Sequence, residues 1–132
     1  MSLKTFTAAY IETALWSSVD ESSDQGGAPL DKNYDPDDIA PDTRKRMEKD
    51  CREFYAEWED AWTESAWSDW QAGHDFWLSR NGHGAGFFDR YFRKGSTLGT
   101  LGPRTRDALQ KAAKAYGSFD LYVGDDGKVH GS

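Results

Sequence analysis

Apolar side chains recur at helical spacing near the start of the chain. Spacings of three and four residues place side chains on one face of an α-helix. The pattern therefore predicts an amphipathic helix over residues 4–16. The apolar set at this spacing is Phe6, Tyr10, Ile11, Ala14 and Leu15.

The next segment, residues 19–38, changes character. It is mostly polar, contains glycine and proline, and offers almost no apolar side chain to bury. Such composition is typical of a connecting segment at the surface. We expect residues 19–38 to form a long surface loop.

The strongest helical pattern covers residues 41–64. Pro41 suits a first helical turn, where its missing N–H is not needed, and Asp42 complements the positive end of the helix dipole. A continuous apolar stripe then follows at steps of three and four residues. The stripe consists of Met47, Cys51, Phe54, Trp58, Ala61 and Trp62. With Trp70 and Trp77 from the next segment, it is predicted to form the main core.

A third helix is predicted to begin after a cap at Ser65 or Ser68 and to run to Arg80. Asn81 and Gly82 tolerate the left-handed conformation that ends many helices, so they are expected to end this one. Its shared face would carry Trp70, His74, Trp77 and Leu78.

The last third of the chain predicts one more helix and a hairpin. The helix covers residues 103–116 and buries Leu109, Ala112, Ala113 and Tyr116. Phe119, Leu121 and Val123 then alternate with polar residues, and the Asp126-Gly127 pair is a hairpin turn signal. A lone hairpin is marginal in water, so it must pack on the helices or recruit a strand from residues 87–92.

These elements predict a mostly α protein with a small β element, an α+β fold. It would contain about four helices and a C-terminal β-hairpin in a single domain over residues 1–132. A chain of 132 residues buries enough surface for one modest core.

The charge of the chain is uneven. The net charge is −7, but residues 1–75 hold 18 acidic and 7 basic side chains, whereas residues 76–132 hold 5 and 9. An acidic face and a basic face are expected, although such charge often serves only solvation. Cys51 is the single cysteine, so no intramolecular disulfide forms, which favours a reducing compartment. No apolar run approaches the length of a membrane span, and a soluble cytoplasmic protein is expected.

The stretch GHDFWLSRNGHGAGFFDR, residues 73–90, combines histidines, charged side chains, glycines and aromatics. We expect a tight reversal in which Gly82, Gly84 and Gly86 adopt positive φ or leave no room for a Cβ. The reversal would bring Phe87 and Phe88 to the tryptophans of residues 67–77. The charged residues on either side would form a network in which Arg80 and Arg90 pair with Asp75 and Asp89.

Metal and cofactor chemistry finds little support in this stretch. The ligand-type side chains are His74, Asp75, His83, Asp89 and His130, but their spacing matches no compact zinc motif. The glycines follow a helix end and lack a P-loop pattern. Residues 31–42 place Pro36 where a calcium loop needs glycine. We therefore predict no cofactor, and a metal-dependent hydrolase using His74, His83 and Asp89 is only the third interpretation.

Nucleic-acid binding is the second interpretation. Basic groups neutralise phosphates and aromatic rings stack on bases, but the chain as a whole is acidic, with a pI near 4.9. The basic and aromatic residues concerned are Arg80, Arg90, Arg93, Lys94, Arg104, Arg106, Lys111 and Lys114, with Phe87, Phe88, Tyr91 and Phe92 among the first of them.

Three stretches carry a family resemblance: YIETALWSS near the start, the stretch over residues 73–90, and KAAKAYGSFDLYVGDDGK near the end. They resemble a family of small uncharacterised proteins encoded by tailed bacteriophages. The chain departs from that family at YFRKGSTLGTLGPRTR, which is longer and more basic. The resemblance implies a phage origin and expression in the cytoplasm of an infected bacterial host, and it implies no chemistry.

The first interpretation is a non-enzymatic phage accessory protein that binds a host or phage macromolecule, above all a protein, and no membrane. Small size, the missing catalytic constellation, the acidic surface and the phage resemblance support it. The candidate contact surface consists of Arg80, His83, Arg90, Arg93 and Lys94.

Overall fold

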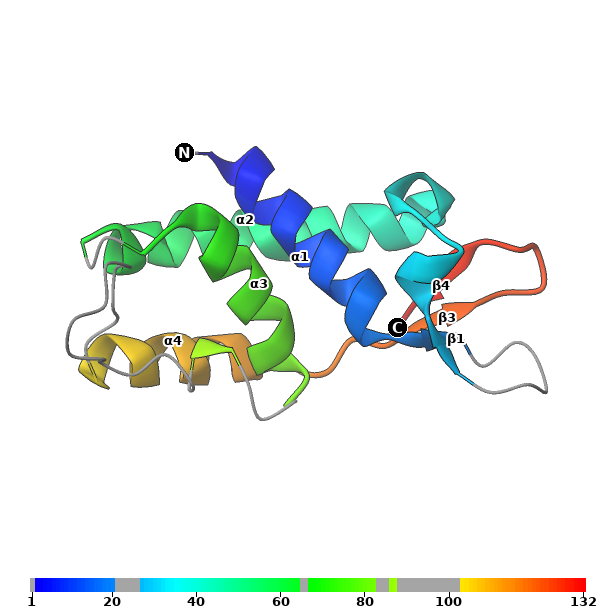
Figure 1. Ribbon diagram of the computed structural model, residues 1–132. Coiled ribbons are helices and arrows are strands. Elements are labelled where there is room, and N and C mark those ends of the chain that lie inside the picture. Colours follow the sequence, from blue (N-terminus) through cyan, green and yellow to red (C-terminus); the bar gives the residue numbers. More distant parts are fainter. Residues whose placement is uncertain (1, 21–26, 65–66, 83–85, 88–102) are drawn as a thin grey trace.

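The computed structural model describes residues 2–20, 27–64, 67–82, 86–87 and 103–132. These residues form four α-helices and two small antiparallel pairs of strands, so the predicted mostly α fold with a small β element is confirmed (Figure 1). The helices are α1 (Leu3–Ser17), α2 (Pro41–Thr63), α3 (Asp69–Arg80) and α4 (Pro103–Ala115). The other elements are β1 (Val19–Asp20), β2 (Ala28–Pro29), the 3-10 turns η1 (Leu30–Lys32) and η2 (Pro36–Asp38), β3 (Leu121–Val123) and β4 (Val129–Gly131). No helix in the described part of the chain is long and apolar enough to cross a membrane.

Helices α1 and α3 pack closely, because a glycine lies at their contact. The position that a Cβ on Gly73 would occupy is taken by the main-chain carbonyl of Phe6, and the Cβ of Ala9 lies 3.1 Å from it. Any side chain at this position would push the helices apart. Gly73 therefore sets the spacing on which the rest of the core is built.

The core is aromatic. The rings of Phe54 and Phe76 stack with centroids 4.1 Å apart, and those of Phe6 and Trp62 stack at 5.3 Å. Trp62 is fully buried, and its indole N–H donates to the carboxylate of Asp69 at 2.9 Å. Most of the predicted stripe is confirmed, since Met47, Cys51, Phe54, Trp62 and Trp77 are buried.

Two tryptophans were placed wrongly in the predicted core. Trp58 is only partly buried at the edge of the core, and Trp70 is 41% exposed. The reason lies in the start of α3. Ser68 caps this helix by accepting a hydrogen bond from the main-chain N–H of Gln71, which puts Trp70 in the first turn on the outer face. Trp67, before the cap, is buried in its stead.

Residues 19–38 contribute more to the core than their composition predicted. Leu30 is fully buried, and Tyr34 packs against the core cluster. The main-chain N–H of Leu30 donates to the carbonyl of Ser18 at 2.9 Å, which extends the β1–β2 pairing and places Leu30 against α1. Leu30 and Tyr34 thus attach this mostly polar segment to the core.

The C-terminal hairpin packs on the helices, which is one of the two arrangements expected for it. The pairs in β3 and β4 are Leu121 with Gly131, Tyr122 with His130 and Val123 with Val129. The outer edge of β4 is held by the beginning of α2: the N–H of Ala40 donates to Val129 at 2.8 Å, and the N–H of Gly131 donates to the hydroxyl of Thr43 at 3.1 Å. Residues 88–92, the alternative source of a strand, lie outside the described residues.

The glycine-rich reversal has the expected positive φ, but Phe87 packs on Phe54 of α2, whereas the prediction brought it to the tryptophans of residues 67–77. Gly82 and Gly86 have φ of 67° and 95°, and Phe87 is fully buried against Phe54, with ring centroids 6.0 Å apart. Gly84 and Phe88 lie outside the described residues.

Candidate functional site

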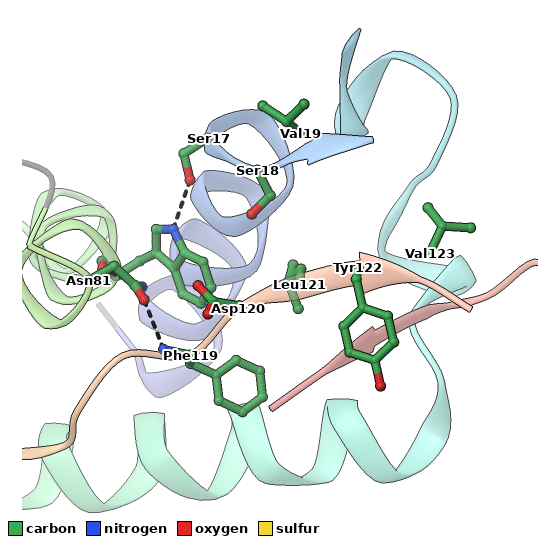
Figure 2. A pocket seen from close by; sticks show the side chains of 10 residues that line it. Ser17, Ser18, Val19, Asn81, Phe119, Asp120, Leu121, Tyr122 and Val123 are labelled. Atoms are coloured by element: carbon green, nitrogen blue, oxygen red, sulfur yellow. Dashed lines mark hydrogen bonds between the residues drawn. The ribbon is translucent and has the colours of Figure 1, made fainter. Parts of the chain in front are cut away.

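A cavity of about 470 Å³ lies where three distant segments of the chain meet (Figure 2). The end of α1 continues into β1 on one side, the end of α3 forms a second wall, and β3 with the residues before it forms the third. The lining residues are Ser17, Ser18, Val19, Trp77, Asn81, Phe119, Asp120, Leu121, Tyr122 and Val123. The lining therefore draws on residues 17–19, 77–81 and 119–123 of the chain.

Side chains at the end of α3 join the three segments. The indole N–H of Trp77 donates to the hydroxyl of Ser17 at 2.7 Å, which ties α3 to α1. The amide of Asn81 donates to the carbonyl of Trp77 at 2.9 Å and accepts from the N–H of Phe119 at 2.8 Å. Figure 2 shows the hydrogen bond of Ser17 with the indole N–H and that of Asn81 with the N–H of Phe119 at the cavity wall. Asn81, predicted only as a helix end, therefore also fixes the start of the hairpin.

Arg80 lies inside the protein, so its predicted place on an exposed contact surface is wrong. It is 6% exposed, and its guanidinium donates to the carboxylate of Asp50 at 2.8 Å and to the hydroxyl of Tyr10 at 2.9 Å. It also donates to the carbonyls of Gly117 at 2.8 Å and Tyr116 at 3.1 Å. The expected pair with Asp75 is not formed. A buried guanidinium needs many acceptors, and three separate segments supply them here: α1, α2 and residues 116–117.

One edge of β3 faces the cavity with its main-chain groups. Asp120 and Ser132 exchange both hydrogen bonds, and the N–H of Gly124 donates to Lys128, so even-numbered residues face β4. Because neighbouring residues of an antiparallel strand alternate between its two edges, the N–H and C=O groups of Leu121 and Val123 point away from β4. The same edge begins at Phe119, whose N–H is taken by Asn81. β1 also borders the cavity and has Cα atoms within 8 Å of those of β3, but it pairs with β2 and not with β3.

The rim of the cavity exposes apolar surface. Val19 is 46% exposed and Tyr122 is 50% exposed. The ring of Tyr122 stacks on His130, with centroids 5.8 Å apart, and His130 contacts the carboxylate of Asp126 at 2.9 Å. This contact with His130 lowers the pKa of the Asp126 carboxyl below its ordinary value. Among the described residues that line the cavity, Asp120 alone carries a formal charge.

The candidate metal ligands are only partly described. His74 contacts the carboxylate of Asp75 at 3.2 Å, and that buried carboxylate also accepts from the indole N–H of Trp67 at 3.2 Å. The remaining candidates, His83 and Asp89, lie outside the described residues. Within the described part of the chain, no three ligating side chains come together to hold a metal. Cys51 is buried in the core, and burial raises the pKa of its thiol.

Most of the predicted contact surface also lies outside the described residues, namely His83, Arg90, Arg93 and Lys94. Of the other basic residues, Arg104, Lys111 and Lys114 are exposed on α4. No local pattern marks Ser17 and Tyr122 as site residues, because only the packing of α1, α3 and the hairpin brings them to the same cavity. Comparisons of the chain with protein-family models, curated proteins and solved structures found no match.

Proposed function

We propose that this chain is a non-enzymatic accessory protein of a tailed phage, which acts in the cytoplasm of the infected host by binding a protein partner. The docking site in this proposal is the cavity between α1, the end of α3 and β3. Arg80 supports the walls of the site from inside. The sequence resemblance supports the phage origin, and the geometry of the cavity and of the β3 edge supports the docking site.

The observation that carries the proposal is the edge of β3 that faces away from β4, with which no strand among the described residues pairs. Leu121 and Val123 direct main-chain donors and acceptors toward the cavity, where an extended polypeptide segment could pair with them. Exposed strand edges are usually blunted by charge, proline or a covering element. The outer edge of β4 is covered by the beginning of α2, whereas the corresponding edge of β3 faces a cavity.

The charge of the lining favours a polypeptide over a nucleic acid. Asp120 is the one formally charged side chain among the described lining residues, and it repels phosphate groups. The exposed apolar side chains of Val19 and Tyr122 provide contact area of the kind that protein interfaces bury.

The test is a selection of peptides from a random display library on the immobilised protein, with Val123→Pro as the counter-selection. Proline removes the outer-edge N–H of Val123 while the β3–β4 ladder, which does not use that group, stays intact. Val123→Ala keeps the N–H and is the matched control. We expect selected peptides to bind the wild type and Val123→Ala, and to lose at least about tenfold in affinity on Val123→Pro, the loss of a main-chain hydrogen bond in a desolvated site.

Amide hydrogen exchange locates the binding. In the free protein, Tyr122 and Gly124 should exchange slowly and Leu121 and Val123 quickly, because only the first two face β4. A selected peptide should slow Leu121 and Val123. Peptides that bind Val123→Pro as well as the wild type, or that protect other amides only, would contradict the proposal. Nuclease-sensitive capture from infected cells, with no peptide selected, would replace it by the nucleic-acid interpretation.

A further inference from the structure

A second cavity, of about 390 Å³, lies on another face of the molecule, between α1 and the segment from η1 to the first turn of α2. It shares no residue with the cavity beside β3. Its lining residues are Ala8, Ile11, Glu12, Leu15, Asp31, Tyr34, Asp35, Pro36 and Arg44.

The cavity is apolar at its base and acidic at its rim. Ile11 and Leu15 are buried at the base, and the partly buried ring of Tyr34 stands beside them. Three exposed carboxylates surround this apolar surface, those of Glu12, Asp31 and Asp35. They come from α1, from η1 and from the cap of η2, so the fold gathers them from separate elements.

Arg44, the one cationic side chain among the described residues of the wall, is already engaged. Arg44 donates to the carbonyl of Pro36 at 3.1 Å, and its guanidinium lies 3.6 Å from the carboxylate of Glu48. The three rim carboxylates therefore outweigh one partly neutralised guanidinium, and the electrostatic preference of the cavity is for a cation.

The geometry points to a binding site for the side chain of an arginine or lysine that a partner protein presents. Such side chains combine an apolar stem with a charged head. The stem would lie on Ile11, Leu15 and Tyr34, and the head would reach the rim carboxylates. The ring of Tyr34 adds the attraction of an aromatic face for a cation. A bare divalent cation fits less well, because no three ligating side chains in the described residues come together around a metal.

The probes are capped tripeptides, Gly-Arg-Gly and Gly-Lys-Gly, with Gly-Norleucine-Gly as the neutral control of similar stem length. Binding is followed at millimolar peptide by NMR of the methyl groups of Ile11 and Leu15, which lie at the base of the cavity. We expect the two cationic peptides to shift these methyl signals and the neutral peptide to leave them nearly unchanged. Raised salt should weaken the effect.

Two matched variants are compared. One neutralises the three carboxylates of the rim, and the control neutralises three carboxylates that do not line the cavity. Glu12→Gln/Asp31→Asn/Asp35→Asn should weaken binding of the cationic peptides about five- to tenfold, the combined effect of three exposed charge pairs. Asn at position 35 keeps the cap of η2, because its side-chain oxygen still accepts a hydrogen bond. The control Asp37→Asn/Asp42→Asn/Glu57→Gln removes the same number of exposed charges elsewhere and should leave binding within about twofold.

Three outcomes would overturn the inference. These are equal shifts with the norleucine peptide, unchanged binding in the rim variant, or no methyl shift with either cationic peptide. None of them bears on the cavity beside β3, whose test uses the Val123 variants and the amides of Leu121 and Val123. The proposals for the two sites can therefore be contradicted independently of each other.

Discussion

The guanidinium of Arg80 lies 2.8 Å from the carboxylate of Asp50, and this ion pair joins α3 to α2 in the interior of the protein. The Arg80 side chain is 4% exposed and that of Asp50 is 22% exposed. The same guanidinium also stands 5.4 Å from the ring centroid of Phe119, at the start of the hairpin. One side chain thus connects the helices to the strand that borders the candidate docking cavity.

Arg80→Met should lower the free energy of unfolding by about 3 kcal/mol or more, because it leaves the Asp50 carboxylate and several oxygen acceptors without their donor. Urea unfolding followed by circular dichroism measures the loss. Arg44→Met, which breaks an exposed pair with Glu48, is the control and should cost about 1 kcal/mol or less. Equal losses in the two variants would show that the buried network adds no stability.

Trp62→Ala should cost about 3–5 kcal/mol, the usual range for emptying a buried aromatic site. Trp62 is fully buried among Phe6, Phe54 and Tyr55. Trp58→Ala should cost about half as much, because Trp58 is only partly buried and less of its surface leaves water on folding. Thermal and urea unfolding of both variants compare the two sites directly, and a larger loss at Trp58 would contradict this description of the core.

Gly86→Ala should destabilise the fold by about 2–4 kcal/mol, the sum of a positive φ and an overpacked contact. At Gly86, φ is 95°, and a Cβ would lie 2.8 Å from the carbonyl oxygen of Asp75 and 2.9 Å from the amide nitrogen of Ser79. Gly82→Ala is the matched control. Its φ of 67° carries the conformational cost, but nothing lies within 4 Å of the added Cβ, so about 1 kcal/mol is expected.

The stability should fall at alkaline pH. Burial raises the pKa of the Tyr116 hydroxyl to about 12, and it raises the pKa of Cys51 and Tyr10 above their ordinary values. The unfolded chain ionises these groups near pH 8.5 for cysteine and 10 for tyrosine, while the folded chain keeps them protonated. The unfolded state therefore loses protons first, and the free energy of unfolding falls as the pH rises above about 8.

Urea unfolding between pH 7 and 11 checks this. Cys51→Ala should flatten the curve between about pH 8 and 9.5, and Tyr116→Phe should flatten it above about pH 10. A wild-type free energy of unfolding that stays constant up to pH 11 would contradict the assignment of these groups to the core.

The sequence by itself determined the four helices and the C-terminal hairpin, but not the short elements within residues 19–38. The four helices begin and end within a few residues of their predicted positions, because amphipathic spacing, Ser68 at a cap and Asn81-Gly82 at a helix end are local signals. The hairpin was equally readable from the alternation of Phe119, Leu121 and Val123 and from the Asp126-Gly127 turn. The positive φ of Gly82 and Gly86 was also predicted, since few other residues tolerate it.

Only the tertiary structure decided which side chains these elements bury and which site they form. Arginine usually lies at the surface. Arg80 can be buried because Tyr10, Asp50 and two carbonyls just after α4 accept its hydrogen bonds. Tryptophan is usually a core residue. Trp70 is exposed to solvent because it lies in the first turn of α3, on the outer face of that helix. The cavity joins Ser17, Asn81 and Leu121 across more than a hundred residues of sequence. No local sequence pattern predicts that these three residues line one cavity, because their proximity depends on how the helices pack against each other and against the hairpin.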